Sequence, residues 1–182
     1  RGDAAEGLTI STFHALGLRF LQQETARAGL KRGFSVFDSD DQMGIVKDLM
    51  PPGTKNDVLQ RLHGLVSRAK NEAMTPEQAM AVAKSAVERE AANLYAKYQQ
   101  RLAAFNAVDF DDLIRLPVTM LEADADFAAG WRERIRYLLV DECQDTNGAQ
   151  YRLLKQLAGP KGSFTCVGDD DQSIYAWRGA QP

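Results

Sequence analysis

Two acidic residues follow an apolar stretch in the second half of the chain, and their types suit catalysis. Residues 137–140 are aromatic or aliphatic without polar alternation, as in a strand covered on both faces of a parallel sheet. Asp141 and Glu142 would emerge at the carboxyl edge of that sheet, where open α/β proteins bind ligands. A carboxylate there can hold Mg²⁺, while its neighbour orients or deprotonates an attacking water. Taken alone, the pattern also fits a helix cap formed by Asp141 or Asp145.

A second polar stretch, residues 168–180, follows the apolar run 164–167 and reads Gly-Asp-Asp-Asp-Gln-Ser-Ile-Tyr-Ala-Trp-Arg-Gly-Ala. Its end places Tyr175, Trp177 and Arg178 within four positions. Two aromatic rings and a guanidinium form a platform on which unpaired bases stack, worth about 1 to 3 kcal/mol per base. The structural alternative is that the rings fill a core and that Arg178 pairs with a nearby acid.

The two apolar runs and the segment between them predict a strand, a helix and a strand within about thirty residues. Such a βαβ unit has parallel strands and a right-handed crossover, so both acidic loops should share one edge of the sheet. A further short strand at residues 8–10 leads into Ser11 and Thr12, either of which can cap the next helix.

Residues from about 22 to 107 predict an all-helical block. Thr75, Pro76 and Gln78 have the spacing of a capping box at a helix start. Helical spacing predicts that Val58, Phe105 and, further on, Tyr151 face inward. A helix after Asp109, whose apolar side includes Phe110, should break at or near Pro117.

The composition is that of a soluble globular protein, with 45% hydrophobic and 26% charged residues among 182. No signal peptide and no apolar run long enough to span a bilayer is visible, which favours a cytoplasmic protein. The net charge of −3 conceals an acidic second half. Because neither half is strongly basic, DNA binding would rely on individual contacts. Lys55, Arg68 and Lys70 could touch duplex DNA, although scattered surface cations are the better default.

Together, residues 140–146 and 168–180 resemble motifs II and III of superfamily 1 DNA helicases of the UvrD/Rep group, most of all its Rep-type members. Residues 10–15 and 109–114 are similar to two further motifs of that group. The order and spacing match over essentially the whole chain. The resemblance implies an α/β fold, a partial RecA-like P-loop NTPase domain whose parallel sheet is interrupted by an all-helical 1B insertion. Residues 1–21 and 108–182 would form the RecA-like domain 1A, and residues 22–107 the insertion.

The same resemblance implies the roles of individual residues. Asp141 would coordinate Mg²⁺ on ATP, Glu142 would activate the attacking water, and Gln172 would sense the phosphate. Hydrolysis of this kind depends mainly on positioning and charge stabilisation. The remaining matched residues fall into two sets: Gln144 and Asp145 would couple nucleotide to DNA, and Thr12, Phe13, His14, Tyr175, Trp177 and Arg178 would contact DNA. Without the resemblance, His14 reads as an ordinary helix-start residue, Phe13 as core, and residues 109–112 as a helix cap.

The implied parent protein is an ATP-dependent helicase that moves 3′ to 5′ on single-stranded DNA and unwinds duplex at single-strand/duplex junctions. Its protein partners are not identified by the sequence, and no membrane association is expected. Cys143 departs from the family, which usually has Tyr there. The sequence lacks Gly-x-x-x-x-Gly-Lys-Ser/Thr, so we expect the phosphate-binding loop before Arg1, a second RecA-like domain after Pro182, and no ATP hydrolysis by this piece alone. Three alternatives remain open: the motor of a helicase-nuclease, a non-motor DNA-binding or partner-docking module, and a metal-dependent phosphoesterase.

Overall fold

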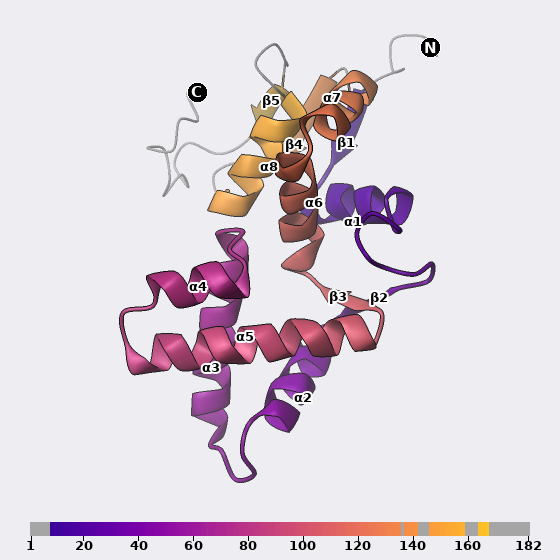
Figure 1. Ribbon diagram of the computed structural model, residues 1–182. Helices are drawn as coiled ribbons and strands as arrows, with labels where there is room; N and C mark the ends of the chain where they lie inside the picture. Colours follow the sequence, from indigo (N-terminus) through magenta and orange to yellow (C-terminus); the bar gives the residue numbers. More distant parts are fainter. Residues whose placement is uncertain (1–7, 136, 142–145, 159–163, 168–182) are drawn as a thin grey trace.

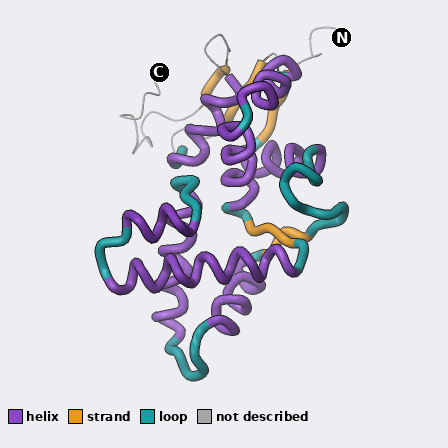
Figure 2. The backbone as a smooth tube through the Cα atoms, viewed as in Figure 1, coloured by secondary structure: helices purple, strands orange, loops and turns teal. Residues whose placement is uncertain are grey.

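The computed structural model describes residues 8–135, 137–141, 146–158 and 164–167, and these are mostly helical. A three-stranded parallel sheet has the order β1-β4-β5, formed by β1 (Leu8–Ser11), β4 (Tyr137–Asp141) and β5 (Phe164–Val167). A second, two-stranded parallel sheet joins β2 (Ser35–Phe37) to β3 (Ala107–Asp109). Figure 2 shows the two sheets at separate places in the molecule, with the shorter pair near its middle.

The strand pairing predicted for the second half of the chain is confirmed. β4 and β5 are parallel neighbours, and α8 (Gly148–Ala158) connects them in sequence. The register pairs Ser11 with Val140 and Asp141 with Val167. All three strands therefore end at the same edge.

A first hydrophobic core lies among the helices beside the three-stranded sheet. These are α1 (Phe13–Gln23), α6 (Asp112–Ala123), α7 (Ala125–Arg134) and α8. Phe20 of α1 lies against Trp131 of α7 with ring centroids 4.5 Å apart, and Val118 and Leu153 are almost completely buried. Figure 1 shows this group of helices gathered around the sheet at one end of the molecule.

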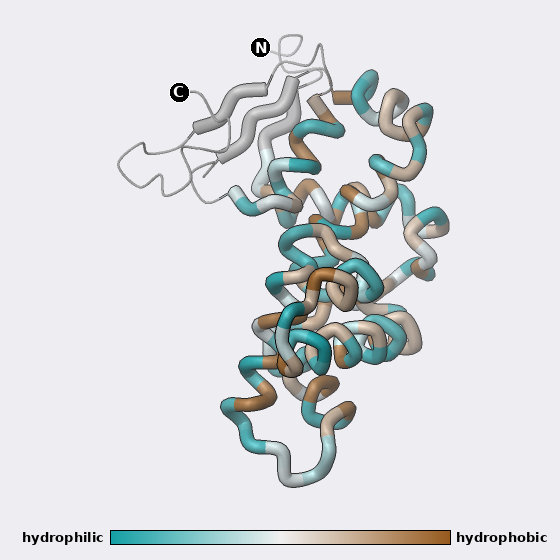
Figure 3. The backbone as a smooth tube through the Cα atoms, turned by 60° about the vertical axis from the view of Figure 1, so that its left-hand side comes forward, coloured by the Kyte–Doolittle hydropathy of each residue, from teal (hydrophilic) through white to brown (hydrophobic). Residues whose placement is uncertain are grey.

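A second core lies in the helical block at the other end (Figure 1), built by α2 (Ser39–Leu49), α3 (Asn56–Asn71), α4 (Pro76–Val82) and α5 (Ala86–Ala104). Hydrophilic and hydrophobic stretches alternate along these helices in Figure 3, as expected where one face of each helix packs inward. The capping box predicted at the start of α4 is present, with Thr75 and Gln78 bonding each other's backbone N–H. β3 joins the two cores, because Ala107 belongs to the second and Val108 to the first.

Three residues predicted to face inward are instead exposed: Val58, Phe105 and Tyr151, with exposed fractions of 38%, 54% and 40%. In α3 the buried position is Leu59, the neighbour of Val58. One residue along a helix is a rotation of about 100°, so a small error of phase moves a side chain from the core to the surface.

The predicted helix break at Pro117 is wrong, because α6 continues through it. A proline lacks the N–H that would bond the carbonyl four residues earlier, here that of Leu113. The backbone of Gly17 approaches this carbonyl so closely that a Cβ on Gly17 would lie 1.8 Å from the Leu113 oxygen. α1 thus packs on α6 at the Leu113 carbonyl, which Pro117 cannot bond within the helix.

Candidate functional site

The candidate site begins at the shared carboxyl edge of the three-stranded sheet. β1 runs directly into Thr12, and β4 ends at Asp141, which is paired in register with the last residue of β5. The backbone of Asp141 is thereby placed at the edge predicted from the sequence. Seven predicted site residues lie outside the described residues: Glu142, Gln144, Asp145, Gln172, Tyr175, Trp177 and Arg178.

The three residues predicted to contact DNA at the start of α1 point in different directions. Thr12 is exposed and caps the helix, with its hydroxyl oxygen accepting the Ala15 N–H at 3.2 Å. His14 is also exposed, and partial burial lowers its pKa, so the ring is neutral near pH 7. Phe13 is only 8% exposed and belongs to the first core. In this arrangement Thr12 and His14 can meet a ligand, and Phe13 anchors the helix that carries them.

Phe110 is a surface residue that the sequence reasoning assigned to the apolar side of a helix. It lies in the turn before α6 and is 50% exposed. Its ring meets that of His14 edge to face, with centroids 5.9 Å apart and an interplanar angle of 79°. The sequence did carry a signal, since Phe110 stands between two aspartates in a turn. The two rings form an exposed surface beside Thr12, which we call the His14–Phe110 surface.

A buried ionic network includes Asp109, the residue before Phe110. Lys70 of α3 donates to Asp109 and to Gln99, both at 2.7 Å, and lies 3.0 Å from Asp112. Arg115 also bonds Asp112, at 2.8 Å, and the Asp109 carboxylate accepts the backbone N–H of Asp112. Buried charges need such partners, because an unpaired charge in the interior is very costly. Lys70 is therefore not the surface cation expected from the sequence, because its side chain is buried within this network.

The protonation of this network follows from its burial and its charges. Burial alone would raise the pKa of Asp112, but the charges of Lys70 and Arg115 lower it overall. Burial and the nearby carboxylate of Asp109 raise the pKa of Tyr98, whose hydroxyl donates to Asp109 at 2.8 Å. Asp112 is thus held in its charged form between two cations, and the tyrosine stays a neutral donor. The network holds β3 and the start of α6 firmly on α3.

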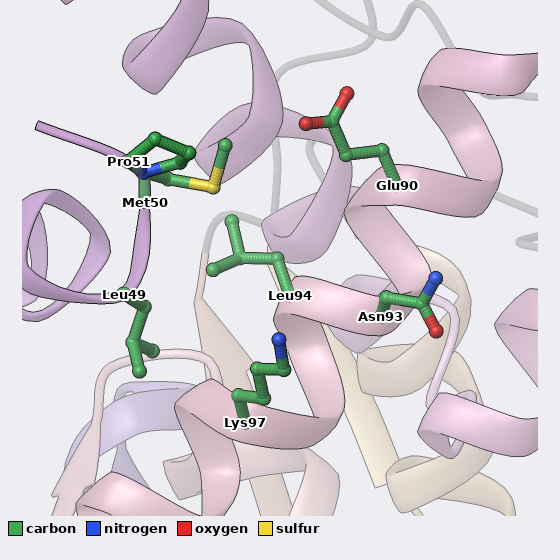
Figure 4. A pocket seen from close by; sticks show the side chains of 7 residues that line it. All are labelled: Leu49, Met50, Pro51, Glu90, Asn93, Leu94 and Lys97. Carbon is green, nitrogen blue, oxygen red and sulfur yellow. The ribbon is translucent and has the colours of Figure 1, made fainter. Parts of the chain in front are cut away.

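Three further observations bear on what the described part of the molecule can bind. A hollow of about 510 Å³ lies between the end of α2 and α5, lined by residues such as Met50, Leu94 and Lys97 (Figure 4), and the site residues Thr12, His14 and Phe110 do not line it. Across the described ranges, no group of three or more His, Cys, Asp or Glu side chains is arranged to hold a metal ion. Across the same ranges, no helix has both the length and the apolar character needed to cross a bilayer.

The described residues form a mostly helical protein with two small parallel sheets, with Thr12 and the backbone of Asp141 at the shared edge of the larger sheet and a helical block between β2 and β3. Residues 1–182 match the UvrD/REP helicase N-terminal domain, and the chain belongs to that family. This confirms the resemblance drawn from the motifs.

Named relatives agree with this assignment. The chain is 48% identical over 180 residues to the ATP-dependent DNA helicase Rep of Salmonella typhimurium and, equally, to that of Escherichia coli. It is 38% identical over 182 residues to the ATP-dependent DNA helicase PcrA of Staphylococcus aureus. The alignments cover 98% of this chain but 27% of each Rep protein and 25% of PcrA. The chain thus spans about a quarter of the length of these relatives.

Proposed function

We propose that this chain is part of an ATP-dependent DNA helicase that translocates 3′ to 5′ on single-stranded DNA and unwinds duplex DNA. The observation that carries the proposal is the common edge at which β1, β4 and β5 end, with Thr12 and Asp141 on it. Nucleotides bind at this edge of parallel sheets. The Rep and PcrA relatives, which are named ATP-dependent DNA helicases, support the same activity.

In this proposal the sheet and its helices belong to a RecA-like domain 1A, formed by residues 1–21 and 108–182. Residues 22–107 are a 1B insertion. Support comes from the two separate cores and from β3, the strand that belongs to both. A motor domain built this way places the nucleotide at the sheet edge and leaves the helical block free to approach DNA.

The nucleotide chemistry would be carried by the acids at the end of β4, Asp141 and Glu142. Carboxylate oxygens are the ligands that Mg²⁺ prefers, and Asp141 ends a strand at the right edge, so the residues fit ATP with Mg²⁺. Hydrolysis of ATP supplies the energy for movement. Asp141 would hold the metal ion, Glu142 would take the proton of the attacking water, and Gln172 would contact the phosphate. Gln144 and Asp145 would transmit the change to the DNA contacts.

The DNA track would run over Thr12, the His14–Phe110 surface and the aromatic set of Tyr175, Trp177 and Arg178. A hydroxyl and a neutral imidazole can donate to phosphate without reading sequence, and exposed rings stack on bases of any identity. Single strands and single-strand/duplex junctions are the substrates that such contacts favour. Phe13 takes part by holding α1 in place, since its side chain is in the core.

ATP hydrolysis by the full-length protein, measured with and without single-stranded DNA, tests the proposal. We expect hydrolysis that DNA stimulates strongly, since the two sites occur on one set of strand ends. Hydrolysis without any response to DNA would contradict the DNA-motor part of the proposal. No hydrolysis under either condition would contradict the proposal as a whole and favour a docking module.

A further inference from the structure

The C-terminal turns of α3 contact two parts of the proposed motor at once. Towards α8, the Asn147 side-chain amide donates to the Asn71 side-chain oxygen at 3.2 Å, and Arg152 donates to the backbone carbonyl of Glu72 at 3.0 Å. Towards β3 and α6, Ser67 donates to the carboxylate of Asp111 at 2.7 Å. One helix of the helical block, α3, therefore contacts both α8 and the turn between β3 and α6.

The contact with α8 lies close in sequence to the carboxyl end of β4. We call the edge where β1, β4 and β5 end, with Asp141 on it, the nucleotide edge. Asn147 follows Asp141 by six positions and forms a reciprocal cap with Gln150: each side-chain oxygen accepts the other residue's backbone N–H, at 2.9 and 3.0 Å. The cap fixes the Asn147 side chain relative to the first turn of α8. If α8 shifted relative to β4, the Asn147 side-chain amide would move with it. Asn71 accepts a hydrogen bond from that amide.

The contact between Ser67 and Asp111 lies next to the His14–Phe110 surface in sequence. Asp111 is the residue after Phe110, whose exposed ring meets His14 at 5.9 Å. The Asn71 amide lies 3.5 Å from the Ser67 hydroxyl, the longest link in the series, and that hydroxyl bonds Asp111. Because a hydroxyl has one proton and Ser67 donates it to Asp111, the Ser67 oxygen can only accept in its contact with the Asn71 amide. The direction of the series is thus fixed, from Asn147 through Asn71 and Ser67 to Asp111.

We propose that Ser67 and Asn71 are positioning residues through which the nucleotide edge and the His14–Phe110 surface influence each other. The proposal rests on the proposed helicase function and names a regulatory route within it. A continuous set of contacts is not in itself proof of coupling, which has to be measured by perturbing both ends. The coupling would also depend on the position of the helical block. The hydrogen bonds to α8 and to Asp111 both come from residues of α3, which belongs to that block.

The experiment measures ATP hydrolysis by the full-length protein over a range of single-stranded DNA concentrations. Ser67→Ala removes the hydroxyl, and we expect the maximal stimulation by DNA to fall about threefold or more. Hydrolysis without DNA should stay close to wild type, and the thermal midpoint should fall only by the small amount expected for one lost hydrogen bond. Asn71→Ala should show the same loss, and the double variant should lose no more than either one, because both belong to one series. Ser67→Thr keeps a hydroxyl and should restore stimulation.

Ser39→Ala is the matched control, since Ser39 is an exposed serine at the start of α2 in the same block. It should behave as wild type. If DNA stimulates hydrolysis by wild type and by Ser67→Ala to the same extent, this inference is overturned, while the proposed function is unaffected. Loss of DNA-free hydrolysis in Ser67→Ala also overturns it, because the role would then be structural. A wild-type protein that DNA does not stimulate contradicts the DNA-motor proposal, and the inference with it.

Discussion

Asp111 is a partly buried carboxyl group whose charge opposes folding. Burial raises its pKa, the Ser67 hydrogen bond lowers it and the nearby Asp109 raises it, and the net result is a pKa of about 6. Because the folded pKa lies above the ordinary value of 3.8, the stability that Asp111 contributes is complete below about pH 4 and is lost as the pH rises through about 6. A side chain that stays neutral in the same place would avoid that loss.

Asp111→Asn should therefore be more stable than wild type at neutral pH, on the order of 1 kcal/mol after allowing for partial exposure. The difference should shrink as the pH falls towards about 4. Thermal unfolding at a series of pH values measures it. Asp48→Asn is the control, because it removes a carboxylate from the exposed side of α2. Wild-type and Asp111→Asn curves that stay parallel across this range would contradict the argument.

Single residues show where sequence reasoning reaches its limit. Lys70 was assigned to the surface because lysine is rarely buried unless paired, and its pairing with Asp109 and Asp112 spans about forty residues of chain. Local spacing carries no sign of such a contact. In contrast, Thr75 was predicted as a helix cap and Thr12 as one of two candidates beside Ser11, and both threonines are caps. Capping depends on a residue and the next three, which the sequence displays directly.

At the scale of elements, α1 and α6 approach closely because Gly17 has no side chain at the Leu113 carbonyl. Gly17→Ala would put a methyl group against backbone, so we expect a loss of stability of about 1 to 3 kcal/mol. The displaced α1 carries His14, so affinity for single-stranded DNA should fall as well. Thermal unfolding and DNA titration measure the two effects.

Gly64→Ala is the control for this change. Gly64 is a helical, exposed glycine in α3 with nothing within 4 Å of a new Cβ. Alanine there should stabilise the helix by up to about 1 kcal/mol and leave DNA affinity unchanged. If Gly17→Ala stabilised the protein as Gly64→Ala does, the argument that α1 and α6 are too close for a side chain at position 17 would be wrong. The contact itself could not be predicted, because Gly17 and Pro117 are a hundred positions apart and meet only in the fold.

At the scale of the whole molecule, the parallel pairing of β4 with β5 and the position of Asp141 at the end of a strand followed from apolar runs and their order. Those features depend on local pattern and on the general handedness of βαβ units. The separation into two cores joined at β3 did not follow from local pattern, since Ala107 and Val108 differ only in which face of a strand they occupy. Two cores with one shared strand suit a motor that must transmit a change between separate sites.

The last prediction separates the nucleotide site and the DNA site of the proposed motor by two single substitutions in the full-length protein. Glu142→Gln keeps the shape of the side chain but cannot accept the water's proton, so ATP turnover should cease while ATP binding and DNA affinity persist. Trp177→Ala removes a stacking surface worth about 1 to 3 kcal/mol, so single-strand affinity should fall roughly 5- to 150-fold while ATP still binds. Nucleotide binding, turnover and DNA titration on both variants measure this. Turnover retained in Glu142→Gln would remove Glu142 from its role, and unchanged DNA affinity in Trp177→Ala would return that ring to the core. Opposite losses in the two variants would show that the acids at the end of β4 act on nucleotide and the aromatic set on DNA.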